Sequence, residues 1–237
     1  MENFSASGFL WILLTAVCIV IILYGLNSVV QMTEWDQKKK KKVIIGALAA
    51  IIGWVALLII LSLNGFFNQF NQLPPHPVFA VLIPLPFVLL AAFSKTGTQL
   101  LRAVPQHWLV FMQSFRVFVE LLLWFAFLSG VLPIQMTFEG GNLDILSGLM
   151  TLPIGYILLK DKPYSSKLVL AYSVIGLLLL LNILTIAVLS MPTPFRYFTN
   201  EPTNAIVAQF PLILLPGVLV PIAYSFHIFS LRKLALK

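Results

Sequence analysis

Long apolar runs separated by short polar connections occupy almost the whole chain. Each run is long enough for the roughly 17 to 25 residues of a bilayer-spanning helix. We therefore predict an all-α, polytopic membrane protein that forms one domain over residues 1–237. Its seven transmembrane helices are expected at about 8–31, 43–64, 77–95, 105–129, 144–160, 167–190 and 205–231.

The composition supports the membrane assignment. Hydrophobic residues make up 59% of the chain and charged residues only 10%, which is far from the balance of a soluble domain. The expected location is the cell membrane, inner or plasma. The single cysteine, Cys18, falls inside the first predicted helix, so the chain cannot form an internal disulfide.

The basic residues gather on alternate connections. Thirteen of the 15 are Lys38–Lys42, Lys95, Arg102, Lys160, Lys162, Lys167, Arg232, Lys233 and Lys237. The positive-inside rule then predicts an outside N-terminus and a cytoplasmic C-terminus. The run Lys38–Lys42 borders a predicted helix, where it would attract anionic lipid or, as the alternative, an acidic partner. The basic charge therefore does not indicate nucleic-acid binding, and the oligomeric state is left open.

Two opposite charges interrupt the fourth predicted helix. Counted from Pro105, Arg116 and Glu120 lie about 16 and 22 Å along the helix axis, within the hydrocarbon region. Charges at that depth face the interior of the bundle and find a partner. Their spacing of four residues predicts an ion pair along one helix face, which Gln113 extends as a polar stripe.

The pair has two interpretations. In the functional one, the stripe lines a solvated cavity in which Glu120 binds a cation or proton, while Arg116 tunes that carboxylate or holds an anionic group. In the structural one, the pair neutralises itself and fixes the helix against its neighbours, with Asn182 of the sixth helix as a further hydrogen-bond partner. Buried salt bridges stabilise poorly, which favours the functional interpretation.

Prolines form a second pattern, because they cluster within predicted helices. Each one removes a backbone hydrogen bond and frees a carbonyl four residues earlier, such as that of Gly217 before Pro221. The resulting kinks are either static or part of a helix that moves beside a transport path. The predicted kinks lie at Pro84, Pro86, Pro211, Pro216 and Pro221.

The connection before the fifth predicted helix carries a group of polar residues. Asn142 is placed to cap that helix, and Asp144 lies in its first turn, where a negative charge is favourable. As the alternative, Glu139, Asn142 and Asp144 form the outer mouth of a path that leads to Glu120. The ligand spacing of a calcium loop is absent.

Signatures of enzymes and cofactors are missing. The histidines His76, His107 and His227 are expected near the membrane boundaries, the first on the opposite side from the other two, so they cannot form one metal site. No metalloprotease, hydrolase or nucleotide-binding motif occurs, and we predict no metal and no cofactor. The expected function is the binding or transport of a small solute or ion by Arg116, Glu120, Gln113 and Asn182. The alternatives are a receptor or membrane-complex subunit, and then a membrane-embedded enzyme.

Overall fold

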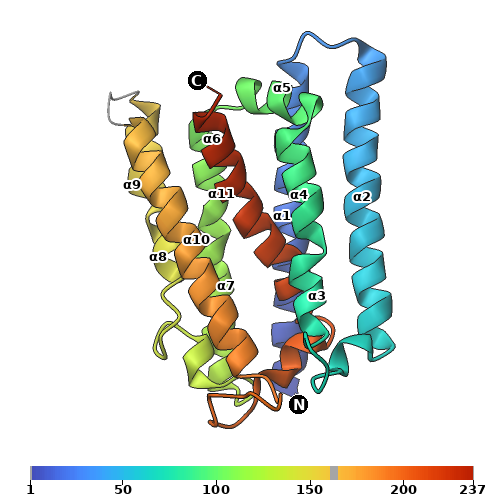
Figure 1. Cartoon of the computed structure of the whole chain (residues 1–237), viewed down its shortest axis with the longest axis vertical. Coiled ribbons are helices and arrows are strands. Elements are labelled where there is room, and N and C mark those ends of the chain that lie inside the picture. The colour runs from blue at the N-terminus through green and yellow to red at the C-terminus, as the bar shows by residue number, and fades with distance from the viewer. Residues whose placement is uncertain (1, 161–164, 237) are drawn as a thin grey trace.

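A computed structural model describes residues 2–160 and 165–236, and within these ranges all regular elements are helices (Figure 1). The prediction of an all-α fold is confirmed for this part of the chain. The longer elements are α1 (Glu2–Gln31), α2 (Gln37–Leu63), α4 (Pro84–Phe93), α5 (Lys95–Ala103), α7 (Phe115–Leu128), α9 (Thr151–Leu159), α10 (Ser165–Leu189) and α11 (Val220–Leu234). The shorter ones are η1 (Phe66–Asn68), α3 (Pro77–Leu82), α6 (Gln106–Phe111), η2 (Met112–Ser114), η3 (Ile134–Met136), α8 (Ile145–Leu149), η4 (Asn204–Ala208) and the π-helix η5 (Leu215–Leu219).

Five helical segments of the described chain are long and apolar enough to cross a membrane, or six if a strongly bent pair counts as one span. The five are Gly8–Gln31, Gln37–Leu63, Gln106–Leu128, Ser165–Leu189 and Leu215–Leu234. The fifth predicted span corresponds to the shorter apolar segment Ile145–Leu159. The N- and C-terminal ends of the chain lie at opposite ends of the bundle (Figure 1).

The lysine run belongs to a helix, although the prediction placed the helix start at residue 43. In the structure α2 begins at Gln37, directly after Asp36, whose backbone is extended. Lysine is a good helix former, so the polar run continues the apolar helix without a break. The first turns of α2 are therefore charged, and the apolar part of the same helix follows them.

The third predicted span is broken twice. Pro84 starts α4 directly after α3 and Ile83, and it suits a first helical position because its missing N–H would be unpaired there anyway. After α4 the chain turns by 73° into α5, which lies across the end of the bundle (Figure 1). Ser94 caps α5 by accepting a hydrogen bond of 2.9 Å from the Gly97 N–H. A side chain at residue 97 would collide with the carbonyl of Ala91, at 1.8 Å, so this bend requires glycine.

The last predicted span begins later than expected. Residues 205–214 are not a transmembrane helix, because the chain there forms η4 and turns before η5 and α11. Pro211 thus lies ahead of the helix and is not a kink within it, whereas Pro216 is in η5 and Pro221 is the second residue of α11. The freed carbonyl of Gly217 accepts a hydrogen bond of 2.7 Å from Trp54 Nε1.

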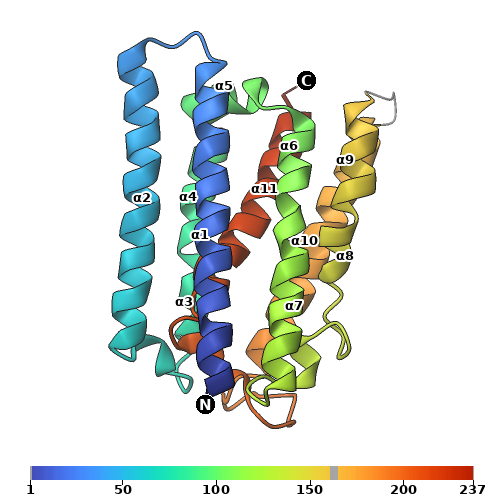
Figure 2. The ribbon, with the colours of Figure 1, turned by 180° about the vertical axis from the view of Figure 1, so that it is seen from behind.

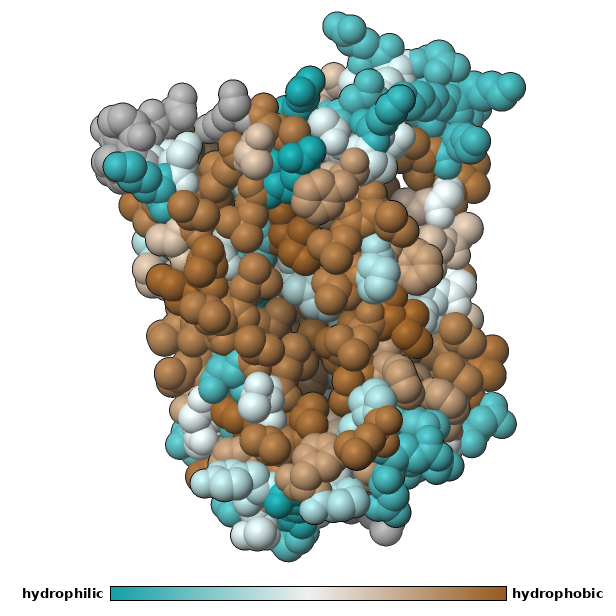
Figure 3. Space-filling model, viewed as in Figure 1, coloured by the Kyte–Doolittle hydropathy of each residue, from teal (hydrophilic) through white to brown (hydrophobic). Residues whose placement is uncertain are grey.

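The interior of the bundle is built around η5 and α11. Helix α11 contacts α4, α6 and α10, and the rear view shows it behind α1 and α7, which pack against each other (Figure 2). Residues 212–225 are buried almost without exception, while large apolar side chains cover the outer surface (Figure 3). A bundle that is apolar on both its inner and outer sides is suited to lipid as its solvent.

Candidate functional site

Arg116 lies at the centre of a buried polar cluster. Its Nε donates to Asp144 Oδ2 at 2.8 Å, and its Nη2 donates to Asp144 Oδ1. The Arg116 side chain is only 2% exposed. The ion pair therefore joins α7 to the residue that precedes α8, and the predicted pairing of Arg116 with Glu120 is wrong.

The geometry of the guanidinium group explains this choice. Two parallel N–H groups fit both oxygens of one carboxylate, and such a planar contact is more specific than a single point contact. Asp144, the residue before α8, presents both carboxylate oxygens to Arg116, whereas Glu120, one turn further along α7, does not. The structure thus selects a partner 28 positions away in the sequence.

His227 completes the coordination of Arg116. Arg116 Nη1 lies 2.9 Å from His227 Nε2, and because a guanidinium group has only donors, Nε2 is the acceptor. The ring therefore carries its proton on Nδ1 and is neutral. The sequence placed His227 near the membrane boundary, but α11 begins only at Val220, which puts His227 midway along the helix and in the core. The late start of α11 is the reason that sequence reasoning missed this residue.

A glycine of α10 makes room for the histidine ring. A Cβ atom at Gly176 would lie 2.4 Å from both Cε1 and Nε2 of His227. The aromatic ring of Tyr172, one turn earlier on α10, lies 5.4 Å from the His227 ring. Its hydroxyl donates to the Ser147 carbonyl at 2.9 Å, so α8, α10 and α11 meet at this point.

Glu120 is 1% exposed and has a different partner. Both of its carboxylate oxygens accept from Asn142 Nδ2, at 2.8 and 2.6 Å. The Asn142 amide is oriented by two backbone groups, since Oδ1 accepts from the Asp144 N–H at 3.1 Å and Nδ2 also donates to the Met136 carbonyl at 3.0 Å. Within the described residues, Glu120 makes no ion pair.

The remaining candidates divide between the interior and the surface. Gln113 is fully buried, and its Nε2 donates to the Ala223 carbonyl at 2.9 Å. Asn182 is exposed and donates to the Gly141 carbonyl at 3.2 Å, so it does not join the cluster. Glu139 is exposed on the connection between η3 and α8. The predicted outer mouth is wrong for Asn142 and Asp144, because both are buried parts of the cluster itself.

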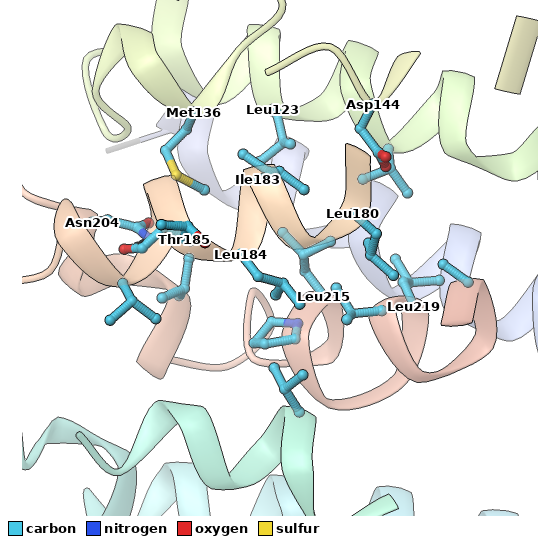
Figure 4. Close-up of a pocket in the computed structure, with 18 of the residues that line it drawn as sticks. Leu123, Met136, Asp144, Leu180, Ile183, Leu184, Thr185, Asn204, Leu215 and Leu219 are labelled. Carbon is cyan, nitrogen blue, oxygen red and sulfur yellow. Dashed lines mark hydrogen bonds between the residues drawn. The ribbon is translucent and has the colours of Figure 1, made fainter. Parts of the chain in front are cut away.

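A cavity of about 400 Å³ adjoins the cluster. It lies among α3, α7, α10, η5 and α11, and apolar side chains, above all leucine and valine, form most of its wall (Figure 4). Arg116, Glu120 and Asp144 contribute to the lining, and Figure 4 shows Asp144 on the opposite side of the cavity from Asn204. The cavity is therefore an apolar chamber with polar groups at two sides.

The cavity opens sideways. Two of its lining residues, Leu82 of α3 and Leu181 of α10, are 47% and 60% exposed on the outer surface of the bundle. The surface is apolar over this face and is hollowed near its middle (Figure 3). In a membrane such an opening would face the lipid hydrocarbon.

Comparison with known proteins identifies a family. Residues 73–235 match the family described as Domain of unknown function (DUF8737), which is more than half of the chain. This chain belongs to that family. No curated protein and no solved structure matches it.

In this DUF8737 protein the matched region holds the complete site. Arg116, Glu120, Asp144 and His227 lie within it, as does every residue that lines the cavity. Helices α1 and α2 lie outside the matched region. The described residues contain no group of three or more His, Cys, Asp or Glu side chains that could hold a metal ion. The chemistry that this DUF8737 site offers is the recognition of a polar group at the end of an apolar chamber.

Proposed function

We propose that this protein crosses the cell membrane seven times and binds a small amphipathic ligand in the cavity beside Glu120. The single observation that carries this proposal is the combination of an apolar chamber of about 400 Å³ with a buried carboxylate in its wall. Ligand sites are typically chambers of about 300 to 1,000 Å³ with apolar walls and a few polar groups that orient the ligand. The cavity has both properties.

The proposed topology adds two spans to the five long apolar helices that the structure describes. The bent segment formed by α3, α4 and α5 and the shorter segment formed by α8 and α9 would be the third and fifth spans. The basic residues support an outside N-terminus and a cytoplasmic C-terminus by the positive-inside rule. In the described chain, Lys38–Lys42, Lys95, Arg102, Lys160, Lys167, Arg232 and Lys233 belong to the cytoplasmic side in this arrangement.

Cysteine labelling tests this topology. In a Cys18→Ala background, Glu139→Cys and Ser166→Cys each place one thiol at an exposed position. An impermeant maleimide added to intact cells should label residue 139 and spare residue 166 until the cells are opened. Labelling of residue 166 in intact cells would contradict the orientation, and labelling of both would contradict an odd number of spans between them.

The binding proposal is tested by filling the cavity. Leu184→Trp adds a large side chain to its wall, whereas Leu178→Trp makes the same change at an exposed position of α10 outside the lining. Biphenylmethanol serves as a neutral probe that fits a chamber of this size. At 100 times its dissociation constant a ligand stabilises the folded protein by about 2.7 kcal/mol, which thermal unfolding of the purified protein in detergent detects.

The expected result is stabilisation of the wild type and of Leu178→Trp by the probe, and none of Leu184→Trp. Equal stabilisation of both tryptophan variants would place the probe elsewhere and refute the proposal. Failure of the wild type to respond to any apolar or amphipathic probe of suitable size would refute it as well.

The Arg116–Asp144 pair favours a second candidate function. This pair is almost completely buried, as expected for a receptor or membrane-complex subunit in which the polar cluster only fixes α7 against α8. The Leu184→Trp variant distinguishes the two candidates. If the cluster is purely structural, no ligand binds in the cavity, so the tryptophan at residue 184 has no binding to abolish.

Anionic lipid is the proposed partner at the cytoplasmic end. Lys39 stacks on the Trp35 ring at 4.0 Å and donates to Gln99 of α5 at 3.1 Å, so α2 and the transverse helix α5 form one basic surface. Polybasic segments next to a bilayer gain about 1 kcal/mol per charge from anionic lipid. Phosphatidylglycerol in nanodiscs should therefore raise the melting temperature of the wild type more than that of a variant with Lys38–Lys42 replaced by Gln. An equal rise would exclude this surface.

A further inference from the structure

We infer that the ligand of this cavity is an amphipathic organic cation, whose protonated amine pairs with Glu120 while its apolar body lies against the leucine wall. This inference rests on the proposed function and adds the chemical class of the ligand. It is carried by the charges around the cavity, the orientation of Asn142, the composition of the wall and a second buried polar atom.

One acidic side chain of the cluster has no cationic partner. Arg116 is its one cation, and each of its three side-chain nitrogens already has a protein partner in Asp144 or His227. Three of its five N–H groups therefore already donate to the protein, and its charge is paired with Asp144. Asp144 balances the charge of Arg116 and His227 is neutral, so Glu120 is the acidic side chain of the cluster that has no cationic partner within the described residues.

The orientation of Asn142 keeps Glu120 in the role of an acceptor. The Asp144 backbone N–H must donate to an oxygen, which fixes Oδ1 on that side and turns Nδ2 toward Glu120. Nδ2 gives one of its hydrogens to the Met136 carbonyl, so the other is shared between the two oxygens of Glu120. One amide group serves both oxygens of Glu120, which leaves lone pairs for a further donor from the cavity.

The surroundings favour an organic cation over a metal ion. Hard metal ions such as Ca²⁺ take six to eight oxygen ligands, and the cavity presents mostly hydrocarbon. An ammonium group needs few acceptors. If the cation also has an apolar body, that body can fill the chamber and keep the ion pair with the carboxylate away from water. The lateral opening beside Leu82 and Leu181 lets such a molecule enter from the bilayer.

A second buried acceptor points to the same ligand class. Asn204 is fully buried and lines the cavity, and its Oδ1 has no hydrogen-bond partner. Its Nδ2 donates to the Ala187 carbonyl at 3.0 Å, which leaves Oδ1 as the free end of the amide. The wall of the cavity therefore contains a second acceptor without a protein partner, which suits a ligand that carries hydrogen-bond donors.

Three probes with one apolar body test the charge of the ligand. Biphenylmethylamine is a cation at neutral pH, biphenylmethanol is neutral, and biphenylcarboxylate is an anion. Their dissociation constants are measured by isothermal titration with the full-length protein in detergent. The amine should bind the wild type at least about tenfold more tightly than the alcohol, because both partners of its hydrogen bond with Glu120 are charged. The carboxylate should bind most weakly.

Two isosteric variants locate the effect. Glu120→Gln keeps an acceptor for Asn142 and should lower amine affinity by at least about tenfold, with little change for the alcohol. Glu139→Gln removes the same charge from an exposed loop and should change neither affinity. If Glu120→Gln does not fold, the order of the three probes on the wild type still decides the question.

The outcomes separate this inference from the proposed function. Binding of the alcohol as tight as that of the amine, or an amine preference that persists in a folded Glu120→Gln protein, would overturn the cation and leave the cavity as a binding site. Tightest binding of the carboxylate would also overturn it. Absence of binding by all three probes would overturn the proposed function itself.

Discussion

Replacement of the buried charges one at a time and in pairs tests which carboxylate holds Arg116. Arg116 donates two hydrogen bonds to Asp144 and, within the described residues, none to Glu120. Removal of one partner of a buried ion pair leaves the other charge uncompensated and costs about 3–5 kcal/mol. Arg116→Met and Asp144→Leu should therefore each lower the free energy of unfolding by about that amount.

The double variants carry the decisive comparison. Arg116→Met with Asp144→Leu removes both charges together and should recover most of the lost stability, because apolar replacements of a buried pair are often neutral. If the double variant lies within about 1 kcal/mol of the wild type, the coupling free energy in the double-mutant cycle is at least about 5 kcal/mol. Arg116→Met with Glu120→Leu leaves Asp144 buried and unpaired, so it should stay about 3–5 kcal/mol below the wild type.

Denaturant titration of the purified protein in detergent, followed by intrinsic tryptophan fluorescence, measures the free energy of unfolding for each variant. The signal of folded protein must return on dilution of the denaturant, so that the cycle reports an equilibrium. Greater recovery in the double variant at residues 116 and 120 than in the one at residues 116 and 144 would refute the assignment of the ion pair.

Two further substitutions test contacts around η5 and α11. Gly176→Ala should destabilise the protein by about 1–3 kcal/mol, because the new Cβ collides with the His227 ring. Gly53→Ala, on the open side of α2, is the control and should stabilise the protein slightly. Equal melting temperatures for the two variants would contradict the placement of His227. Trp54→Phe should cost about 1–3 kcal/mol, since it removes the donor to the Gly217 carbonyl. An unchanged melting temperature would show that another group or water serves that carbonyl.

The apolar pattern predicted helices well where each helix is long and uninterrupted. The ranges expected for α1 and α10 agree closely with Glu2–Gln31 and Ser165–Leu189, apart from the longer N-terminal end of α1. An apolar run indicates burial in protein or lipid, however, and not a particular backbone conformation. Residues 205–214 are mostly apolar and buried or half-buried without forming a transmembrane helix, since proline and turn residues interrupt the hydrogen-bond pattern there.

The sequence by itself determined that Arg116 and Glu120 need buried partners, because charged groups within an apolar helix cannot remain without them. Local spacing suggested that they pair with each other. Only the tertiary structure decided otherwise, since it brings Asp144 and His227 to Arg116 from positions 28 and 111 residues away. The spacing of four residues describes neighbours on one helix, whereas a long guanidinium side chain also reaches other helices. The packing of α8 and α11 against α7 thus set the ion pair and left Glu120 beside the cavity.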